Sequence, residues 1–278
     1  MKNIPKLGVG LGFREPLRSN IFLHRASIDF LEITTDHYID AAPQKLIELD
    51  LLNQHFPLIP HSLDLSLGSA EGISEEYLAK VAEVVERVNP AWFSDHICFT
   101  GSNGTKLGHL APVPYTDEAL KVFVQNVTRV KKRITVPLIL ENITYDLRYP
   151  SSAMSEAAFI RKVVEETDCG LLLDVTNLYI NSRNHGYDWR EFLDILPLER
   201  VVQLHYVGSL ERGNRLIDAH STETEEEIWE VFREVCRRTV VKGSVLERDE
   251  NFPAFTEIVS ELGKAREICA RISLQQNI

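Results

Sequence analysis

Short apolar runs alternate with segments of helical periodicity along most of the chain. An apolar run of roughly four to eight residues that closes on a polar residue is typical of a buried parallel strand. Eight runs resemble this pattern, and most of them carry a carboxylate or a histidine at or next to their last residue. They cover residues 7–12, 28–33, 58–61, 91–97, 138–142, 170–174, 201–205 and 244–247.

Helical segments follow these runs. Apolar residues recur at helical spacing behind Ser74, Thr116 and Ser155, each of which suits an N-cap. The expected helices cover residues 43–52, 74–88, 116–130, 158–166, 188–196, 223–238 and 255–272. Gly170 suits a helix stop. We expect loops at 98–114, at 181–186 and after the seventh strand.

Eight strands alternating with helices predict a (β/α)8 TIM barrel. The chain has 278 residues, and one such barrel takes about 250. No linker or change of composition divides the sequence. We therefore expect a single domain over residues 1–278.

Composition narrows the class of protein. Hydrophobic residues make up 44% and charged residues 26%, as in globular proteins with a large core. No apolar run approaches the ~20 residues of a membrane span, and the N-terminus lacks the pattern of a signal peptide, so we expect a cytoplasmic protein with no membrane partner. The net charge of -11 disfavours nucleic acid. Four widely spaced cysteines predict neither a disulfide framework nor a thiolate metal site.

Histidines and carboxylates gather at the carboxyl ends of the strands, which meet at one mouth in a barrel. The set is Glu32, His61, His96, Glu141, Asp174, His205 and Glu247, with Asn177, Asp218 and His220 in adjoining loops. Such groups in one cavity would repel or lie unpaired without cations. Their N and O donors suit zinc, iron or manganese, and carboxylates able to bridge favour two or three ions. We expect structural roles for His24, His37, His55 and His109.

Several motifs resemble those of the multinuclear non-haem iron-dependent oxidative enzymes, a family long catalogued as domain of unknown function 692. They are Pro60-His61-Ser62-Leu63 with Leu65-Ser66, Asp95-His96, Glu141-Asn142, Leu171 to Val175 with Asn177, Asn184-His185-Gly186, His205, Asp218-x-His220, and Glu247. The sequence departs from the family pattern at Asp95, Thr176, Ser209 and Leu246, where the family often has Glu, Asn, His and Trp. These departures indicate an outlying member.

The resemblance implies a TIM barrel that holds two or three iron ions and uses dioxygen to modify cysteine in ribosomally made peptides. His61 and His96 would bind one edge of the cluster and Glu141 would bridge. The set would be completed by Asp174, Asn177, His205, Asp218, His220 and Glu247. The implied substrate is a cysteine-containing precursor peptide, and family members often act with a separate peptide-recognition protein.

Five further residues are candidates for contacts behind the ligands or with substrate: Glu32, Asp95, Asn142, Tyr145 and His185. Asp95 is the plausible outer partner of His96, although neighbouring residues of a strand point to opposite faces. Glu141 is expected between two metals, with Asn142 on the substrate side.

Two other classes stay open. The ligand order also resembles the endonuclease IV and xylose isomerase barrels, which use zinc or manganese for hydrolysis or isomerisation. Against this, Asn177 stands where endonuclease IV has a histidine, and the net charge of -11 disfavours a DNA enzyme. An inactive barrel acting as a binding protein is the third class, although loss of activity should have eroded the ligands.

Overall fold

Eight parallel strands close into a barrel in the computed structural model, which describes residues 4–102 and 104–275. Around the barrel the order is β1-β12-β9-β8-β7-β4-β3-β2. The bounds are β1 Gly8–Gly12, β2 Phe30–Thr34, β3 Leu58–His61, β4 Phe93–His96, β7 Leu138–Glu141, β8 Gly170–Asp174, β9 Val201–Tyr206 and β12 Gly243–Leu246. The eight expected strands and the TIM barrel are confirmed.

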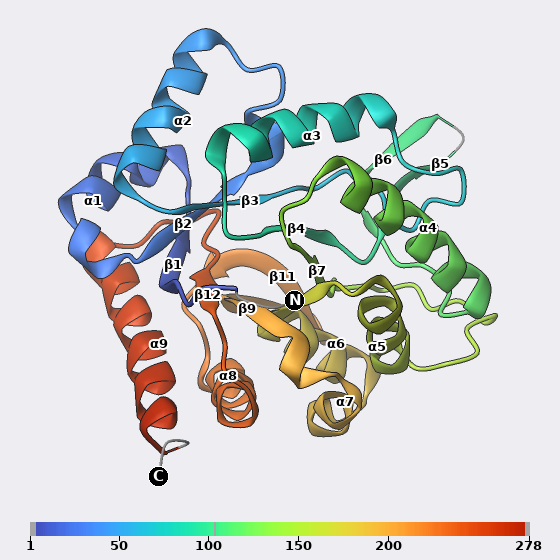
Figure 1. Ribbon diagram of the computed structural model, residues 1–278. Coiled ribbons are helices and arrows are strands. Elements are labelled where there is room, and N and C mark those ends of the chain that lie inside the picture. Colours follow the sequence, from blue (N-terminus) through green and yellow to red (C-terminus); the bar gives the residue numbers. More distant parts are fainter. Residues whose placement is uncertain (1–3, 103, 276–278) are drawn as a thin grey trace.

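Helices surround the strands (Figure 1). They are α1 Arg18–Leu23, α2 Pro43–His55, α3 Glu75–Val88, α4 Asp117–Arg133, α5 Glu156–Thr167, α6 Val175–His185, α7 Trp189–Ile195, α8 Glu226–Arg238 and α9 Phe255–Gln275. The expected caps are confirmed, because Ser74, Thr116 and Ser155 each accept a backbone N–H three residues on. In the described part of the chain, no helix combines the length and apolarity needed to cross a membrane.

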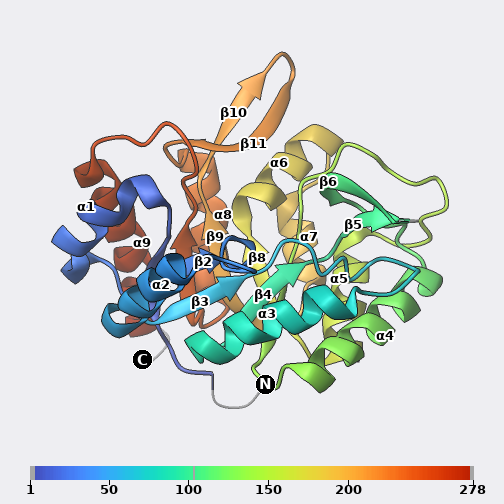
Figure 2. The ribbon, with the colours of Figure 1, turned by 90° about the horizontal axis from the view of Figure 1, so that it is seen from above.

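Two hairpins stand where loops were expected. Hairpin β5 Phe99–Ser102 with β6 Thr105–Ala111 follows the fourth barrel strand, and β10 Gly208–Arg212 with β11 Arg215–Thr222 follows the seventh. The second hairpin projects from the barrel (Figure 2). It places Asp218 and His220 on strand β11 rather than in a loop.

Two smaller expectations were wrong. The segment 181–186 belongs largely to helix α6, which begins directly after β8 because Asp174 caps it by accepting the N–H of Asn177 at 2.8 Å. Gly170 does not stop helix α5. Asp168 ends that helix in the left-handed conformation at φ 51°, and Gly170 opens β8.

An apolar layer inside the barrel forms the floor of the mouth. Seven buried residues compose it: Phe30, Ile59, Trp92, Ile139, Leu172, Val202 and Val245. Side chains two positions apart on a strand share a face. Five of the polar residues predicted for the site, namely Glu32, His61, Glu141, Asp174 and Glu247, therefore stand two positions beyond a floor residue and enter the same interior.

Candidate metal centre

The polar strand ends meet in a cavity of about 510 Å³ at the barrel mouth. Its walls include His61 and His96 from β3 and β4, Glu141 from β7, and Glu247 just beyond β12. Asn177, Asp218 and His220 also line it. The expected convergence of these distant residues on one cavity is thus observed.

Three groups of donors within the described residues could each hold a metal ion. The groups are His61, His96 and Glu141; then Glu141, Asp174, His205 and Glu247; then His220, Glu247 and Asp249. Within a group, the potential ligand atoms lie within 4.8 Å of one another. Glu141 and Glu247 each belong to two groups. The arrangement is therefore a chain of three sites joined by two carboxylates, which suits two or three ions.

The first group presents two imidazole Nε2 atoms to one carboxylate oxygen. His61 Nε2 lies 3.5 Å and His96 Nε2 3.4 Å from Glu141 Oε2. His61 Nδ1 lies 2.8 Å from Ser94 Oγ, which fixes the ring. Burial lowers the pKa of His61 and lowers that of His96 to about 4. Both imidazoles are therefore neutral at neutral pH, the state that binds metals.

The central group is organised by a buried chain of hydrogen bonds. Trp92 Nε1 donates to Gln203 Oε1 at 2.8 Å, and Gln203 Nε2 donates to Glu32 Oε2 at 2.5 Å. Glu32 Oε1 lies 2.8 Å from His205 Nε2. This contact turns His205 Nδ1 towards Glu141 and Glu247, at 3.3 and 3.0 Å. A carboxylate behind a histidine is the usual device that orients an imidazole ligand.

The side chain of Asn142 forms hydrogen bonds with both the C=O and the N–H of Asp174. Its Nδ2 donates to Asp174 O at 3.0 Å, and its Oδ1 accepts Asp174 N–H at 2.9 Å. Asn177 Nδ2 donates to Asn142 O at 3.0 Å. Both polar atoms of the Asn142 side chain thus bind the main chain behind the ligands, whereas the sequence suggested that Asn142 would face the substrate.

The third group lies nearer the surface. His220 Nδ1 is 3.8 Å from Glu247 and 3.4 Å from Asp249, while His220 Nε2 is 2.7 Å from Asp218 Oδ1. Asp218 thus stands behind His220 as Glu32 stands behind His205, and it belongs to none of the three groups. Arg14 contacts Asp249 at 2.5 Å and Glu247 at 3.5 Å.

Several carboxylate and amide oxygens are buried close together in this centre. Burial raises the pKa of Glu141 to about 7 and, with the charge of Glu141, raises the pKa of Asp174 well above its usual range. Asp174 Oδ2, Asn177 Oδ1 and Glu141 Oε2 are buried without a hydrogen-bond partner among the described residues. Such orphaned oxygens are costly in a protein interior. The donor set therefore fits metal ions.

Asp95 does not serve His96 as expected. Its carboxylate accepts the backbone N–H of His96 and of Leu65, and it lies 4.0 Å from His96 Nδ1. That Nδ1 has no hydrogen-bond partner among the described residues. Alternation along the strand explains why the two side chains separate.

Tyr145 and His185 lie away from the ligands. Their rings stack with centroids 4.6 Å apart, and His185 Nε2 lies 2.7 Å from Tyr145 O. Neither is among the residues lining the metal cavity.

Three of the residues that depart from the family pattern make contacts outside the donor groups. Thr176 forms hydrogen bonds with the main chain of Val207, and Ser209 forms hydrogen bonds with Glu225. Leu246 is buried in the hydrophobic core.

Several residues of this region were not predicted from the sequence. Asp249 completes the third group, Gln203 supports Glu32, and Arg14, His37 and His109 line the cavity. Two of these had a signal, since Gln203 stands two positions before His205 and Asp249 two positions after Glu247. His37 and His109 were expected to be purely structural. His24 and His55 pack against Phe255 and Phe22, in keeping with a structural role.

Solved structures share the fold. Endonuclease IV from Thermus thermophilus has a TM-score of 0.57 at 15% identity, over 96% of this chain and 100% of that one. D-Psicose 3-epimerase from Clostridium cellulolyticum H10 has a TM-score of 0.56 at 12% identity, over 95% and 99%. A xylose isomerase domain protein from Planctomyces limnophilus has a TM-score of 0.56 at 10% identity, over 98% and 99%. At these identities the likeness concerns the fold alone, and it confirms a xylose-isomerase-like TIM barrel.

Sequence relatives are much closer. A UPF0276 protein of Anaeromyxobacter sp. (strain Fw109-5) is 34% identical over 273 residues, which is 97% of this chain and 96% of that protein. A UPF0276 protein of Caulobacter vibrioides (strain NA1000 / CB15N) is 33% identical over 260 residues, 93% of each. The family model described as "RiPP precursor modification enzyme MbnB/TglH/ChrH" matches residues 8–270. The chain belongs to this family, the one that its motifs resemble.

Proposed function

We propose that this protein is a multinuclear iron-dependent oxidative enzyme that uses dioxygen to modify a ribosomally made peptide at cysteine. One observation carries the proposal: three donor groups at the barrel mouth are joined by the shared carboxylates Glu141 and Glu247. Membership of a family of precursor-peptide modification enzymes supports a peptide substrate.

The proposed ligands are nitrogen and oxygen donors. They are His61, His96, Glu141, Asp174, His205, His220, Glu247 and Asp249, with Asn177 as a further oxygen donor on the same cavity wall and Asp218 behind His220. Two or three iron ions suit this set, and zinc or manganese would accept similar donors. Iron would supply one-electron chemistry towards dioxygen. The four cysteines of the chain lie outside the three groups, so the thiol in this proposal comes from the substrate.

The chain's own residues orient the donors and receive the peptide. Glu32 fixes His205 and Ser94 fixes His61, so their free nitrogens face Glu141. Asn142 clamps the backbone of Asp174. Arg14, His37 and His109 line the cavity and are the proposed contacts for the peptide.

The test looks for short cysteine-containing peptides encoded beside the gene and uses each one found as a substrate. Each is incubated with anaerobically purified, iron-loaded protein, with and without any neighbouring recognition protein, and dioxygen is then admitted. The expected result is a mass change in one peptide that requires both iron and dioxygen and maps to a cysteine. A protein that leaves every such peptide unchanged but cleaves abasic DNA with zinc would refute the proposal.

A further inference from the structure

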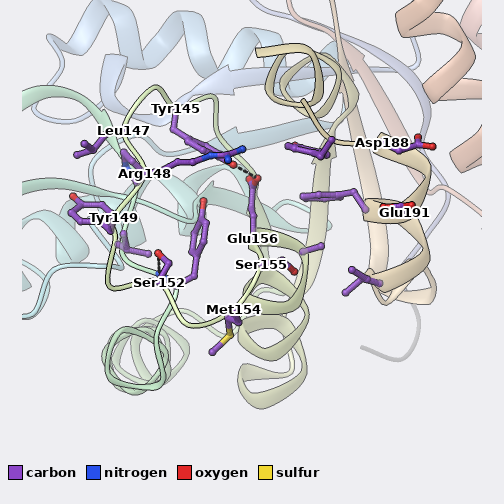
Figure 3. Close-up of a pocket in the computed structure, with 17 residues that line it drawn as sticks. Tyr145, Leu147, Arg148, Tyr149, Ser152, Met154, Ser155, Glu156, Asp188 and Glu191 are labelled. Atoms are coloured by element: carbon purple, nitrogen blue, oxygen red, sulfur yellow. Dashed lines mark hydrogen bonds between the residues drawn. The ribbon is translucent and has the colours of Figure 1, made fainter. Parts of the chain in front are cut away.

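A second cavity, of about 380 Å³, lies outside the metal mouth between the segment after β7, the start of α5 and helix α7 (Figure 3). Its wall is mainly apolar and aromatic, with Tyr115, Tyr145, Tyr187, Met154 and Phe192 among its residues. Its size falls in the roughly 300–1,000 Å³ range of ligand pockets.

A buried acid sits among these apolar groups. Glu156, the first residue of α5, is 8% exposed, and Tyr145 Oη donates to its Oε2 at 3.0 Å. Figure 3 shows Glu156 between the loop residues Leu147 and Tyr149 on one side and Asp188 and Glu191 on the other. Burial raises the pKa of Glu156 to about 8. The group is therefore largely a neutral carboxylic acid at neutral pH, able to donate as well as accept a hydrogen bond.

The aromatic wall is held in place from behind. His185 stacks on Tyr145 at an interplanar angle of 14°. The Tyr145 backbone N–H donates to Asn181 Oδ1 at 3.3 Å. Tyr115 packs against Phe159 with ring centroids 5.3 Å apart. The pocket is thus preformed, which reduces the entropic cost of binding.

A third cavity, of about 540 Å³, adjoins both this pocket and the metal mouth, because it shares lining residues with each of them. It shares Pro112, Tyr145 and Leu147 with the aromatic pocket, and His109, Thr144 and Asp218 with the metal cavity. Tyr145 follows Glu141 by four residues, so their Cα atoms are at most about 14 Å apart. An extended peptide of roughly four residues covers that distance.

We infer that the pocket around Glu156 binds a tyrosine or tryptophan side chain of the peptide substrate, within roughly six residues of the position that is modified at the metal mouth. The inference rests on the proposed function, because it assumes a peptide lying along the three adjoining cavities. Aromatic walls favour a flat ring, and the carboxylic acid offers one hydrogen bond to a phenol or indole group. Arg148, Asp188 and Glu191 also line the pocket, so an amine is included as the competing cationic probe.

The experiment measures the dissociation constants of p-cresol, toluene and n-butylamine by ligand-observed NMR on the metal-loaded full chain without dioxygen. Ile195→Trp fills the pocket from its partly exposed wall. Ile47→Trp, at an exposed position of α2, is the matched control. We expect p-cresol to bind at least about tenfold more weakly to the first variant and normally to the second.

Two further variants test the acid. Glu156→Leu should abolish the preference for p-cresol over toluene, and Glu156→Gln should retain it. Equal p-cresol binding by wild type and both tryptophan variants, or a preference for n-butylamine, would overturn the inference. Since no turnover is measured, this outcome is independent of whether the protein oxidises a peptide.

Discussion

At the scale of single residues, the centre depends on carboxylates that stand behind histidines. Glu32 Oε1 lies 2.8 Å from His205 Nε2, and Asp218 Oδ1 lies 2.7 Å from His220 Nε2. Each imidazole therefore turns its Nδ1 towards carboxylates of a donor group that could hold a metal ion. The sequence marked Glu32 as a candidate without assigning it a partner. Glu32 follows the floor residue Phe30 by two positions, so both side chains point into the barrel. Inside the barrel, Glu32 reaches His205.

Replacing Glu32 by Gln should weaken metal binding about 10- to 100-fold, the usual effect of losing such an outer partner. The amide would no longer fix the ring of His205 by charge. The measurement is the chelator concentration that removes half of the metal, with Glu83→Gln, on the exposed face of α3, as the matched control. Identical curves for both variants would show that Glu32 does not orient His205.

The free energy of unfolding should depend on pH through the buried carboxyl group of Glu156. Its pKa in the folded protein is about 8, above the ordinary 4.5, because it is buried. As the pH rises between these values, the unfolded chain releases this proton and the folded chain keeps it, so the folded state loses stability. Glu156→Gln removes this loss. The melting temperature of the variant relative to wild type should therefore rise from pH 5 to pH 8, and a constant difference would contradict the burial argument.

At the scale of elements, β8 passes into α6 without a loop, and Asp174 serves both. One oxygen caps the helix by accepting Asn177 N–H, and the other is a buried orphan among the donors. The sequence identified the strand and its acid but not the helix, because polar residues near the end of α6 suggested a loop. The cap and the left-handed Gly186 at φ 70° set the bounds of that helix.

The two roles of Asp174 can be separated. Asp174→Asn keeps an oxygen acceptor for the cap but removes a charged donor, whereas Asp174→Ala removes both. In chelator-treated protein, the free energy of unfolding measured with urea should be about 1 kcal/mol higher for Asp174→Asn than for Asp174→Ala, because an N-cap usually contributes that much. Both variants should bind less metal than wild type. Equal stability of the two would argue against the cap.

At the scale of the whole molecule, the barrel fold explains which strands and site residues could be predicted from the sequence. Short apolar runs separated by helical segments predicted all eight strands, and barrel closure predicted that their carboxyl ends would meet. The hairpins, and residues such as Arg14, His37 and His109, were not predictable in this way. Their position near the mouth depends on tertiary contacts between segments far apart in sequence. The hydrophobic periodicity of a segment carries no information about such contacts.

We propose that Glu141, which belongs to two donor groups, would join two ions of an iron cluster. The most direct test is the metal content of anaerobically purified, iron-reconstituted protein, measured by mass spectrometry of the elements for wild type and Glu141→Ala. We predict two or three iron ions per wild-type chain and the loss of more than one in the variant. Stoichiometric zinc that iron cannot replace would refute an iron cluster, and the loss of a single ion in the variant would show that Glu141 does not join two ions.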